Sequence, residues 1–260
     1  MPDTERMNQE AKQVKSRRGI YLLPNMITTA AMFSGFYAIV ASMDGRFEAA
    51  AIAIFIAMVL DGLDGRVARL TNTQSEFGVQ YDSLSDMVCF GLAPALVVYE
   101  WSLKSMLSVG WAKLGWLAAF IYTASAALRL ARFNSQVATA EKSYFRGLPS
   151  PSAAGVLAGM VWAATDTGWQ GESLVYVAFV LTISMGLLMV SNIRYHSFKE
   201  INFKNRVPFV AILIVVMVYV FASIDPPKVL FSGFMIYTVF GIVYTLVVVR
   251  NRRKARKRGE

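Results

Sequence analysis

Charged side chains are scarce in this chain of 260 residues. They make up 17% of the sequence, whereas soluble domains average about 25%. Hydrophobic residues make up 55%, and the mean hydropathy is +0.45. The apolar residues also form runs that approach the roughly 20 residues needed to cross the hydrocarbon core of a bilayer. The composition therefore argues against a soluble domain and predicts an integral membrane protein.

The sequence has a single cysteine, and no cleavable signal peptide is visible at its start. Cys89 is the one cysteine, so no intramolecular disulfide framework is possible. It lies in an apolar run, and a small buried hydrophobe is its simplest interpretation. The first twenty residues are polar and basic, without the short apolar segment and small-residue cleavage site of a signal peptide. We expect this segment to be a cytosolic arm.

Long apolar runs dominate the rest of the chain, and prolines lie near their ends, where the loss of a backbone donor is tolerated. We therefore predict an all-α fold, a polytopic transmembrane helical bundle of about eight spans (six to eight). The expected spans are residues 21–43, 47–70, 83–103, 112–133, 151–166, 173–192, 207–222 and 228–249. They form one transmembrane domain, 21–249, between a basic arm, 1–20, and a basic tail, 250–260.

Lysine and arginine are distributed unevenly between the two predicted sides. Cytoplasmic connections carry an excess of both, which sets the orientation. With the N-terminus in the cytosol, all but four of the 26 fall on the cytosolic side; the exceptions are Arg46, Lys104, Lys113 and Lys228. Both termini are therefore predicted to be cytosolic. Because the basic residues flank apolar spans, we expect contact with the lipid bilayer and its anionic headgroups, and no nucleic-acid partner.

Four aspartates lie at the ends of two apolar spans. Asp61 and Asp64 are three residues apart in the second span, and Asp82 and Asp86 are four residues apart at the start of the third. On helices each pair projects from one face, and the short connection between the spans can bring the two faces together. Each ionised group within an apolar span costs roughly 3 kcal/mol. The four carboxylates therefore need a shared compensating interaction.

A divalent cation compensates four carboxylates well. Mg²⁺ takes oxygen ligands and keeps positions open for substrate phosphates. Gly62, Gly65 and Gly78 have no side chain and let a bulky ligand approach the backbone, while Arg69, one turn beyond Asp64, is placed to bind a phosphate oxygen. A cation pathway in a transporter is the competing interpretation. For any single aspartate, a helix cap or a solvated position is the simpler one.

The chain is similar to the CDP-alcohol phosphotransferases at every defined position of their signature, which here reads Asp61-x2-Asp64-Gly65-x2-Ala68-Arg69-x8-Gly78-x3-Asp82-x3-Asp86. The resemblance implies a helical membrane fold with a site for two divalent ions, Mg²⁺ or Mn²⁺, near the cytosolic surface. It also implies transfer of a substituted phosphate from a CDP-linked alcohol to a second alcohol, with release of CMP. A homodimer in the inner, cytoplasmic membrane of a prokaryote is expected with it.

The resemblance also assigns roles to individual residues. Asp61 and Asp82 would bridge both metals, Asp64 would complete one metal site, and Asp86 would ligate the other and act as general base. The CDP group would be contacted by residues of the signature, of the connection before Gly78 and of the first span: Gly65, Arg69, Ser75, Pro24, Asn25 and Thr28. For the last four of these, a helix start, a cap or a loop hydroxyl is the ordinary alternative.

Three further segments resemble the phosphatidylserine synthase branch of the family: Asp82–Pro94, Leu128–Asn134 and Phe145–Pro151. They imply CDP-diacylglycerol and L-serine as substrates. An amino-acid acceptor brings a carboxylate, which a guanidinium binds well, so Arg129, Arg132 and Arg146 are candidate acceptor-binding residues. Positive-inside anchoring is an adequate alternative for any one of them. Glycerol phosphate, inositol phosphate and choline remain alternative acceptors.

Overall fold

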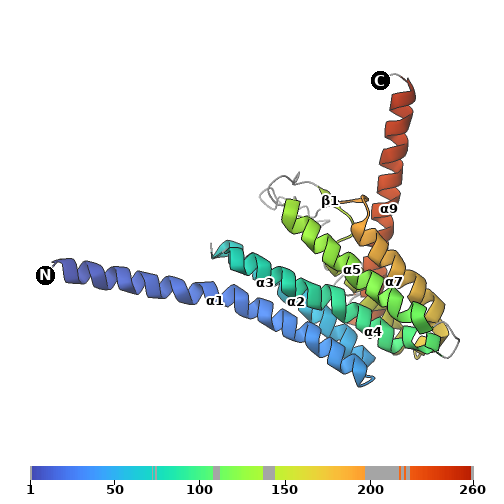
Figure 1. Ribbon diagram of the computed structural model, residues 1–260, viewed down its shortest axis with the longest axis horizontal. Coiled ribbons are helices and arrows are strands. Elements are labelled where there is room, and N and C mark those ends of the chain that lie inside the picture. The colour runs from blue at the N-terminus through green and yellow to red at the C-terminus, as the bar shows by residue number, and fades with distance from the viewer. Residues whose placement is uncertain are drawn as a thin grey trace.

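The computed structural model of the protein describes the backbone of residues 2–71, 73, 75–107, 112–136, 144–196, 217, 220 and 223–258. Side chains are described within these ranges, except for residues 2–22, 107, 112, 136, 144–146, 194–196 and 249–258. Long helices run side by side in a bundle, with α1 and α9 extending beyond it in different directions (Figure 1). The α-helices are α1 Pro2–Met43, α2 Phe47–Leu70, α3 Glu76–Asp86, α4 Ala93–Trp101, α5 Ala112–Gln136, α6 Ser150–Asp166, α7 Val175–Val190 and α9 Pro226–Arg258.

The remaining described elements are short. A π-helical segment, η1 Met87–Leu92, joins α3 to α4, and two 3-10 segments, η2 Leu103–Leu107 and η3 Gly171–Leu174, lie in connections. Three-residue strands, β1 Tyr144–Arg146 and β2 Arg194–His196, pair antiparallel. The all-α prediction is confirmed, with this small strand pair as an unpredicted addition.

Within the described part of the chain, five helical segments are long and apolar enough to cross a membrane: Leu23–Met43, Glu76–Trp101, Lys113–Ser135, Gly171–Val190 and Pro226–Val248. They correspond to the first, third, fourth, sixth and eighth predicted spans. The third begins at Glu76, seven residues before its predicted start.

The predicted second and fifth spans are also helices of the bundle. The second, α2, carries Glu48, Asp61 and Asp64, and these charges lower its hydropathy. The fifth, α6, has 17 residues, fewer than the roughly 20 that cover the hydrocarbon core. Most of the predicted seventh span, 207–222, lies outside the described residues. A total of about eight spans remains a prediction.

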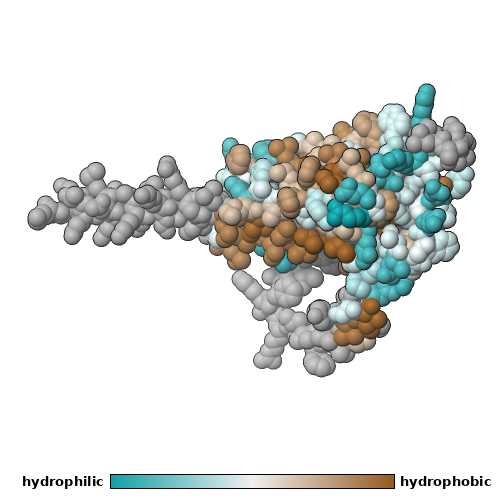
Figure 2. Space-filling view, turned by 90° about the horizontal axis from the view of Figure 1, so that it is seen from below, coloured by the Kyte–Doolittle hydropathy of each residue, from teal (hydrophilic) through white to brown (hydrophobic). Residues whose placement is uncertain are grey.

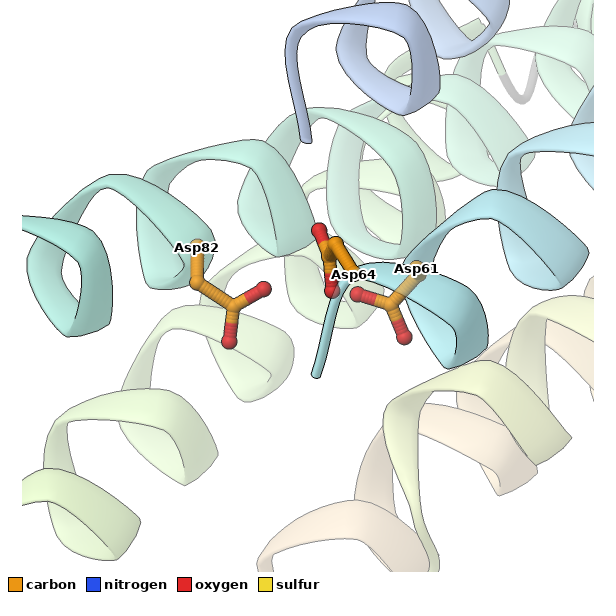
Figure 3. Close-up of side chains that lie close together, drawn as sticks. All are labelled: Asp61, Asp64 and Asp82. Atoms are coloured by element: carbon orange, nitrogen blue, oxygen red, sulfur yellow. The ribbon is translucent and has the colours of Figure 1, made fainter. Parts of the chain in front are cut away.

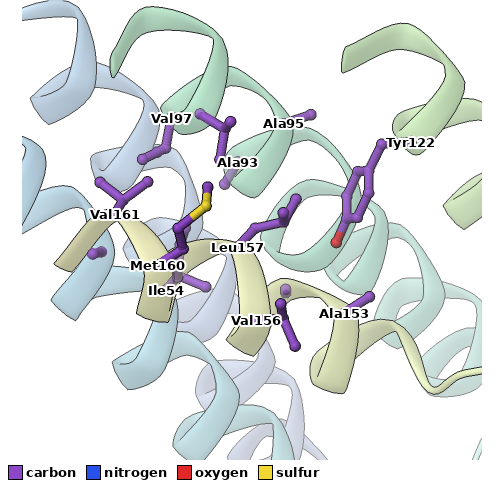
Figure 4. Packing of buried hydrophobic residues seen from close by; sticks show 14 of the residues in the cluster. Ile54, Ala93, Ala95, Val97, Tyr122, Ala153, Val156, Leu157, Met160 and Val161 are labelled. Atoms are coloured by element: carbon purple, nitrogen blue, oxygen red, sulfur yellow. The ribbon is translucent and has the colours of Figure 1, made fainter. Parts of the chain in front are cut away.

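Helix α6 lies inside the bundle, against α2 and α4 (Figure 4). Its glycines bring α9 close, because a Cβ added at Gly159 would lie 2.9 Å from the Phe231 Cα, and one at Gly155 would lie 2.7 Å from the Phe234 ring. Small residues allow such close helix packing in membranes, where dispersion contacts replace the hydrophobic effect as the main attraction. The core combines aliphatic side chains such as Ile54 and Leu157 with buried aromatic ones.

The outer faces of the bundle are apolar, as expected for helices that contact lipid. Met26, Phe33 and Phe36 are exposed on α1. Figure 2 shows a band of hydrophobic side chains on one face of the molecule, with hydrophilic side chains gathered towards the end away from the N-terminus. Exposed apolar surface of this extent would be unfavourable in water and is favourable in a bilayer.

A tight turn between α1 and α2 determines which residues meet at the other end of the pair. Gly45 has φ +74°, a left-handed conformation that glycine adopts without strain, and α2 then runs back along α1. The beginning of the apolar part of α1, near Thr28, therefore lies beside the C-terminal half of α2. Helix α3 packs on the same part of α1, since Tyr81 and Thr29 hydroxyls are 2.8 Å apart.

Candidate active site

Three aspartates converge where α2 and α3 meet. Asp61 and Asp64 project from the last turns of α2, and Asp82 projects from α3 towards them (Figure 3). One carboxylate oxygen from each lies within 4.8 Å of the others. The expected convergence of the two helix faces is therefore present in the structure for these three residues.

Asp64 is held in place from α1. The Thr28 hydroxyl donates to Asp64 Oδ2 at 2.6 Å and also lies 3.1 Å from the Pro24 carbonyl oxygen. Asp64 is only 4% exposed, so this hydrogen bond replaces water at one of its oxygens. Thr28 was predicted as a nucleotide contact; in the structure its hydroxyl faces a predicted metal ligand.

Asp86 is the last residue of α3 and belongs to the same cluster. Its carboxyl group is in hydrogen-bonding contact with that of Asp61. Its other oxygen, Oδ1, is buried and has no hydrogen-bond partner among the described residues. A buried carboxylate oxygen without a donor is costly, so Asp86 is arranged to receive a group that the described residues do not provide.

These residues fit a divalent cation. Carboxylates in mutual contact repel one another when ionised, and the unpartnered Asp86 oxygen leaves an acceptor unused. Asp61, Asp64, Asp82 and Asp86 offer only oxygen ligands, which Mg²⁺ and Mn²⁺ prefer. The site is thus chemically suited to the hard divalent ions that the sequence predicts, while the number and identity of the ions stay predictions.

Glycines leave room beside the carboxylates. A Cβ added at Gly62 would meet nothing within 4 Å, and one at Gly65 would lie 3.8 Å from Arg69 Nη1. The Arg69 guanidinium is therefore placed directly over the Gly65 backbone. Because Arg69 is also exposed, its donors are accessible to a phosphate that approaches Gly65.

The other predicted nucleotide contacts gather at the start of α3. Ser75 is the N-cap of α3 and accepts a hydrogen bond from the Gly78 amide at 3.0 Å. A Cβ at Gly78 would lie 3.6 Å from Asn25 Oδ1, which places Asn25 beside the same turn. The cap explains Ser75 without a ligand, and its role in nucleotide binding stays a prediction.

The three candidate acceptor-binding arginines lie in different environments. Arg129 Nη1 donates to Ser150 Oγ at 2.7 Å, and its guanidinium is close enough to Asp86 to interact with it electrostatically. Arg132 Nη2 donates to Asn192 Oδ1 at 2.9 Å at an exposed position. The backbone of Arg146 is in β1, and its side chain is not among the side chains that the structure describes. Of the two described side chains, Arg129 is the one that interacts electrostatically with Asp86.

Ser150 is a part of this site that the sequence reasoning missed. It is the first residue of α6, is fully buried and binds Arg129. Its position between Pro149 and Pro151 is a sequence signal for a helix start, but nothing local indicates that this start lies against α5. The pairing depends on the packing of helices that are distant in sequence.

Comparisons with known proteins agree with the geometry. The family model described as CDP-alcohol phosphatidyltransferase matches residues 21–190, a range that contains all the candidate site residues. A protein of Helicobacter pylori (strain J99) named CDP-diacylglycerol–serine O-phosphatidyltransferase is 31% identical over 241 residues, covering 91% of this chain and 98% of the relative.

Similar proteins occur in other bacteria and in archaea. A CDP-diacylglycerol–serine O-phosphatidyltransferase of Mycobacterium bovis is 38% identical over 189 residues, covering 69% of this chain and 63% of the relative. An archaetidylserine synthase of Methanothermobacter thermautotrophicus is 35% identical over 175 residues, covering 66% of this chain and 69% of the relative. The aspartates converge, and the family model matches residues 21–190, which is most of this chain. This chain therefore belongs to the CDP-alcohol phosphatidyltransferase family.

Proposed function

We propose that this enzyme transfers the phosphatidyl group of CDP-diacylglycerol to the hydroxyl group of L-serine, giving phosphatidylserine and CMP. The observation that carries the proposal is the buried oxygen of Asp86, which has no hydrogen-bond partner among the described residues and lies beside three converging aspartates, within electrostatic range of the Arg129 guanidinium. The names of the relatives support the same pair of substrates.

The carboxylates of Asp61, Asp64, Asp82 and Asp86 would hold two divalent ions, Mg²⁺ or Mn²⁺. When bound, these ions neutralise the carboxylates and offset the charge of a diphosphate. Thr28 keeps Asp64 in the orientation that a ligand requires. Gly65 leaves the backbone accessible, and Arg69 provides donors for a phosphate oxygen. Pro24, Asn25 and Ser75 are proposed as further contacts of the CDP group.

The proposed reaction is an in-line displacement at the β-phosphorus. A bond forms between the serine hydroxyl oxygen and phosphorus, while the bond from phosphorus to the bridging oxygen breaks. CMP leaves with the electron pair of that bond. Asp86 accepts the proton of the hydroxyl group, since a free alcohol is a weak nucleophile near neutral pH. The unpartnered Oδ1 of Asp86 is available for this proton.

Arg129 is proposed to bind the carboxylate of serine. A guanidinium presents five donors in a planar fork and binds carboxylates through two parallel hydrogen bonds. One of these donors is directed to Ser150, and this bond fixes the plane of the fork beside Asp86. Arg132 and Arg146 stay secondary candidates for the same role.

The active site is proposed to face the cytosol from the inner membrane of a prokaryote. The aspartates lie at the end of the bundle where the apolar part of α1 begins, and the basic segment before it favours the cytosolic side. Lipid tails would stay in the bilayer while the headgroup and serine meet at this surface. A homodimer is proposed as the working assembly.

An acceptor assay tests this function. Purified protein in phospholipid vesicles with CDP-diacylglycerol and Mg²⁺ or Mn²⁺ is expected to release CMP on addition of L-serine and to stop when EDTA is added. CMP release with glycerol phosphate, inositol phosphate or choline, but not with serine, would show that the proposed acceptor is wrong. No CMP with any acceptor, together with cation flux across the vesicle membrane, would favour a transporter.

A further inference from the structure

The helix that carries Asp86 changes its geometry directly after this residue. Pro94 has no N–H group, so the carbonyl of Phe90, four residues earlier, cannot receive the usual α-helical hydrogen bond. The chain widens here into the π segment Met87–Leu92, in which the Ala93 N–H bonds the carbonyl of Val88, a step of five residues. Such segments are rare and often occur at functional sites.

A side chain of α5 supplies the donor that Pro94 removes. The Tyr122 hydroxyl donates to the Phe90 carbonyl oxygen at 2.9 Å, and the Tyr122 side chain is fully buried. Figure 4 shows its ring extending from α5 into the bundle. Phe90 is also fully buried, so no water is available to replace this donor.

Two further side chains of α5 interact with the helix that carries Asp86. Arg129, seven residues or about two turns after Tyr122, interacts with Asp86. Further along, Asn134 Nδ2 donates to Ser83 Oγ at 3.0 Å. Arg129 thus lies between two interhelical hydrogen bonds, and these fix how far α5 can slide or rotate against α3 and the π segment.

We propose that Tyr122 and Asn134 are positioning residues that keep the Arg129 guanidinium within electrostatic range of Asp86 and so determine the affinity for the acceptor. The inference rests on the proposed function, because it takes Arg129 as the group that binds the serine carboxylate. A bidentate arginine–carboxylate pair depends strongly on orientation. Sliding of α5 would therefore weaken acceptor binding while leaving the CDP-lipid contacts on α1 and α2 unchanged.

Steady-state kinetics of the full-length protein in vesicles with Mn²⁺ test this role. The Tyr122→Phe variant removes the hydroxyl group that donates to Phe90. It is expected to raise the KM for serine about fivefold, which corresponds to the net contribution of one hydrogen bond. The KM for CDP-diacylglycerol is expected to stay as in the wild type. Asn134→Ala is an independent second variant in case Tyr122→Phe folds poorly. It is expected to raise the KM for serine and to leave the KM for CDP-diacylglycerol unchanged.

Two controls separate positioning from general support of the fold. Tyr37→Phe makes the same chemical change at the far end of α1, where the hydroxyl accepts from Arg46, and is expected to leave both KM values unchanged. If Tyr122 acts through Arg129, the double variant Tyr122→Phe/Arg129→Lys will have the serine KM of Arg129→Lys alone.

A lower kcat for Tyr122→Phe and Asn134→Ala with both KM values unchanged would show that the two residues only support the fold, and would overturn the proposal. Additive effects in the double variant would overturn it as well. Wild-type protein that releases CMP with another alcohol but not with serine would refute the proposed function itself, and with it this role of Arg129. The wild-type assay therefore distinguishes a wrong acceptor from a wrong role for Tyr122 and Asn134, because only a wrong acceptor changes the result for the wild type.

Discussion

At the scale of single residues, each of the four aspartates has a different environment. Asp64 receives a hydrogen bond from Thr28, Asp82 faces the pair on α2, and Asp86 has one oxygen without a donor. A group with a fixed donor is suited to holding a ligand in one orientation, whereas a group with an unused acceptor is suited to taking a proton. The different environments therefore support different proposed roles for chemically identical side chains.

Replacing Thr28 by valine tests the support of Asp64. The Thr28→Val variant keeps the shape of the side chain but removes the donor at 2.6 Å, so Mn²⁺ affinity is expected to fall roughly 10–100-fold. Titration of purified protein with Mn²⁺, followed by electron paramagnetic resonance, measures this directly. Thr167→Val, an exposed threonine at the end of α6, is the matched control. Equal Mn²⁺ affinity in Thr28→Val and wild type would contradict the proposal that Thr28 orients Asp64 as a metal ligand.

Replacing Asp86 by asparagine tests the proposed general base. The amide cannot accept the proton, so kcat is expected to fall roughly 10²–10⁴-fold, while the KM for CDP-diacylglycerol changes little. CMP release at saturating serine and Mn²⁺ measures the effect. The same change at Asp225, which pairs with Lys228 at the start of α9, is the control. Full turnover by Asp86→Asn would exclude the proton-accepting role.

At the scale of elements, contacts between small residues and backbone determine how the helices approach. Gly35 brings α1 against the π segment, where an added Cβ would lie 2.9 Å from the Cys89 Cα. Gly159 does the same between α6 and α9. In a bilayer, helix association depends on such close contacts and on interhelical hydrogen bonds. The arrangement of the site therefore depends on glycines that lie outside the aspartate cluster.

The contact between α6 and α9 gives a prediction for stability. In Gly159→Ala the new methyl group would meet the backbone of Phe231 at 2.9 Å, and backbone cannot move aside as a side chain can. We expect a loss of roughly 1–3 kcal/mol, measured as a lower apparent melting temperature in detergent. Gly233→Ala, on the same helix as Phe231 with nothing within 4 Å of the new atom, is expected to cause no loss. Equal melting temperatures for the two variants would contradict this packing.

At the scale of the whole molecule, the orientation in the membrane determines which substrates can reach the aspartates. The proposed acceptor serine and the proposed product CMP are water-soluble, whereas the proposed donor CDP-diacylglycerol is held in the lipid, so the proposed reaction needs a site with access to both water and lipid. The aspartates lie at one end of the bundle, and the turn at Gly45 lies at the other. We expect the aspartate end, and both termini, to be on the cytosolic side.

Cysteine labelling in intact cells tests this orientation. Cys89 is buried and is not expected to react with a membrane-impermeant maleimide, so introduced cysteines report their own side. Lys104→Cys, at an exposed position in η2, is expected to be labelled from outside. Arg252→Cys, in the basic tail, is expected to be labelled only after permeabilisation. The reverse pattern would show that the orientation is inverted.

Much of the bundle was predictable because the membrane allows few alternatives. Apolar runs in lipid must form helices to satisfy their backbone groups, and the predicted spans 47–70 and 151–166 agree closely with α2 and α6. The third span was placed seven residues late, because Glu76 and Gln80 make its first turns polar. The β1–β2 pair was not predicted, since three-residue strands leave no readable period.

The sequence by itself determined the apolar helices and the two pairs of aspartates that share a helix face, because hydropathy and helical spacing act locally. The tertiary structure decided the rest of the site. Only the packing shows that Thr28 binds Asp64, that Arg129 interacts electrostatically with Asp86 while Arg132 binds Asn192, and that Ser150 binds Arg129. These contacts join helices far apart in the chain, and their geometry depends on how closely the helices approach, which no local pattern encodes.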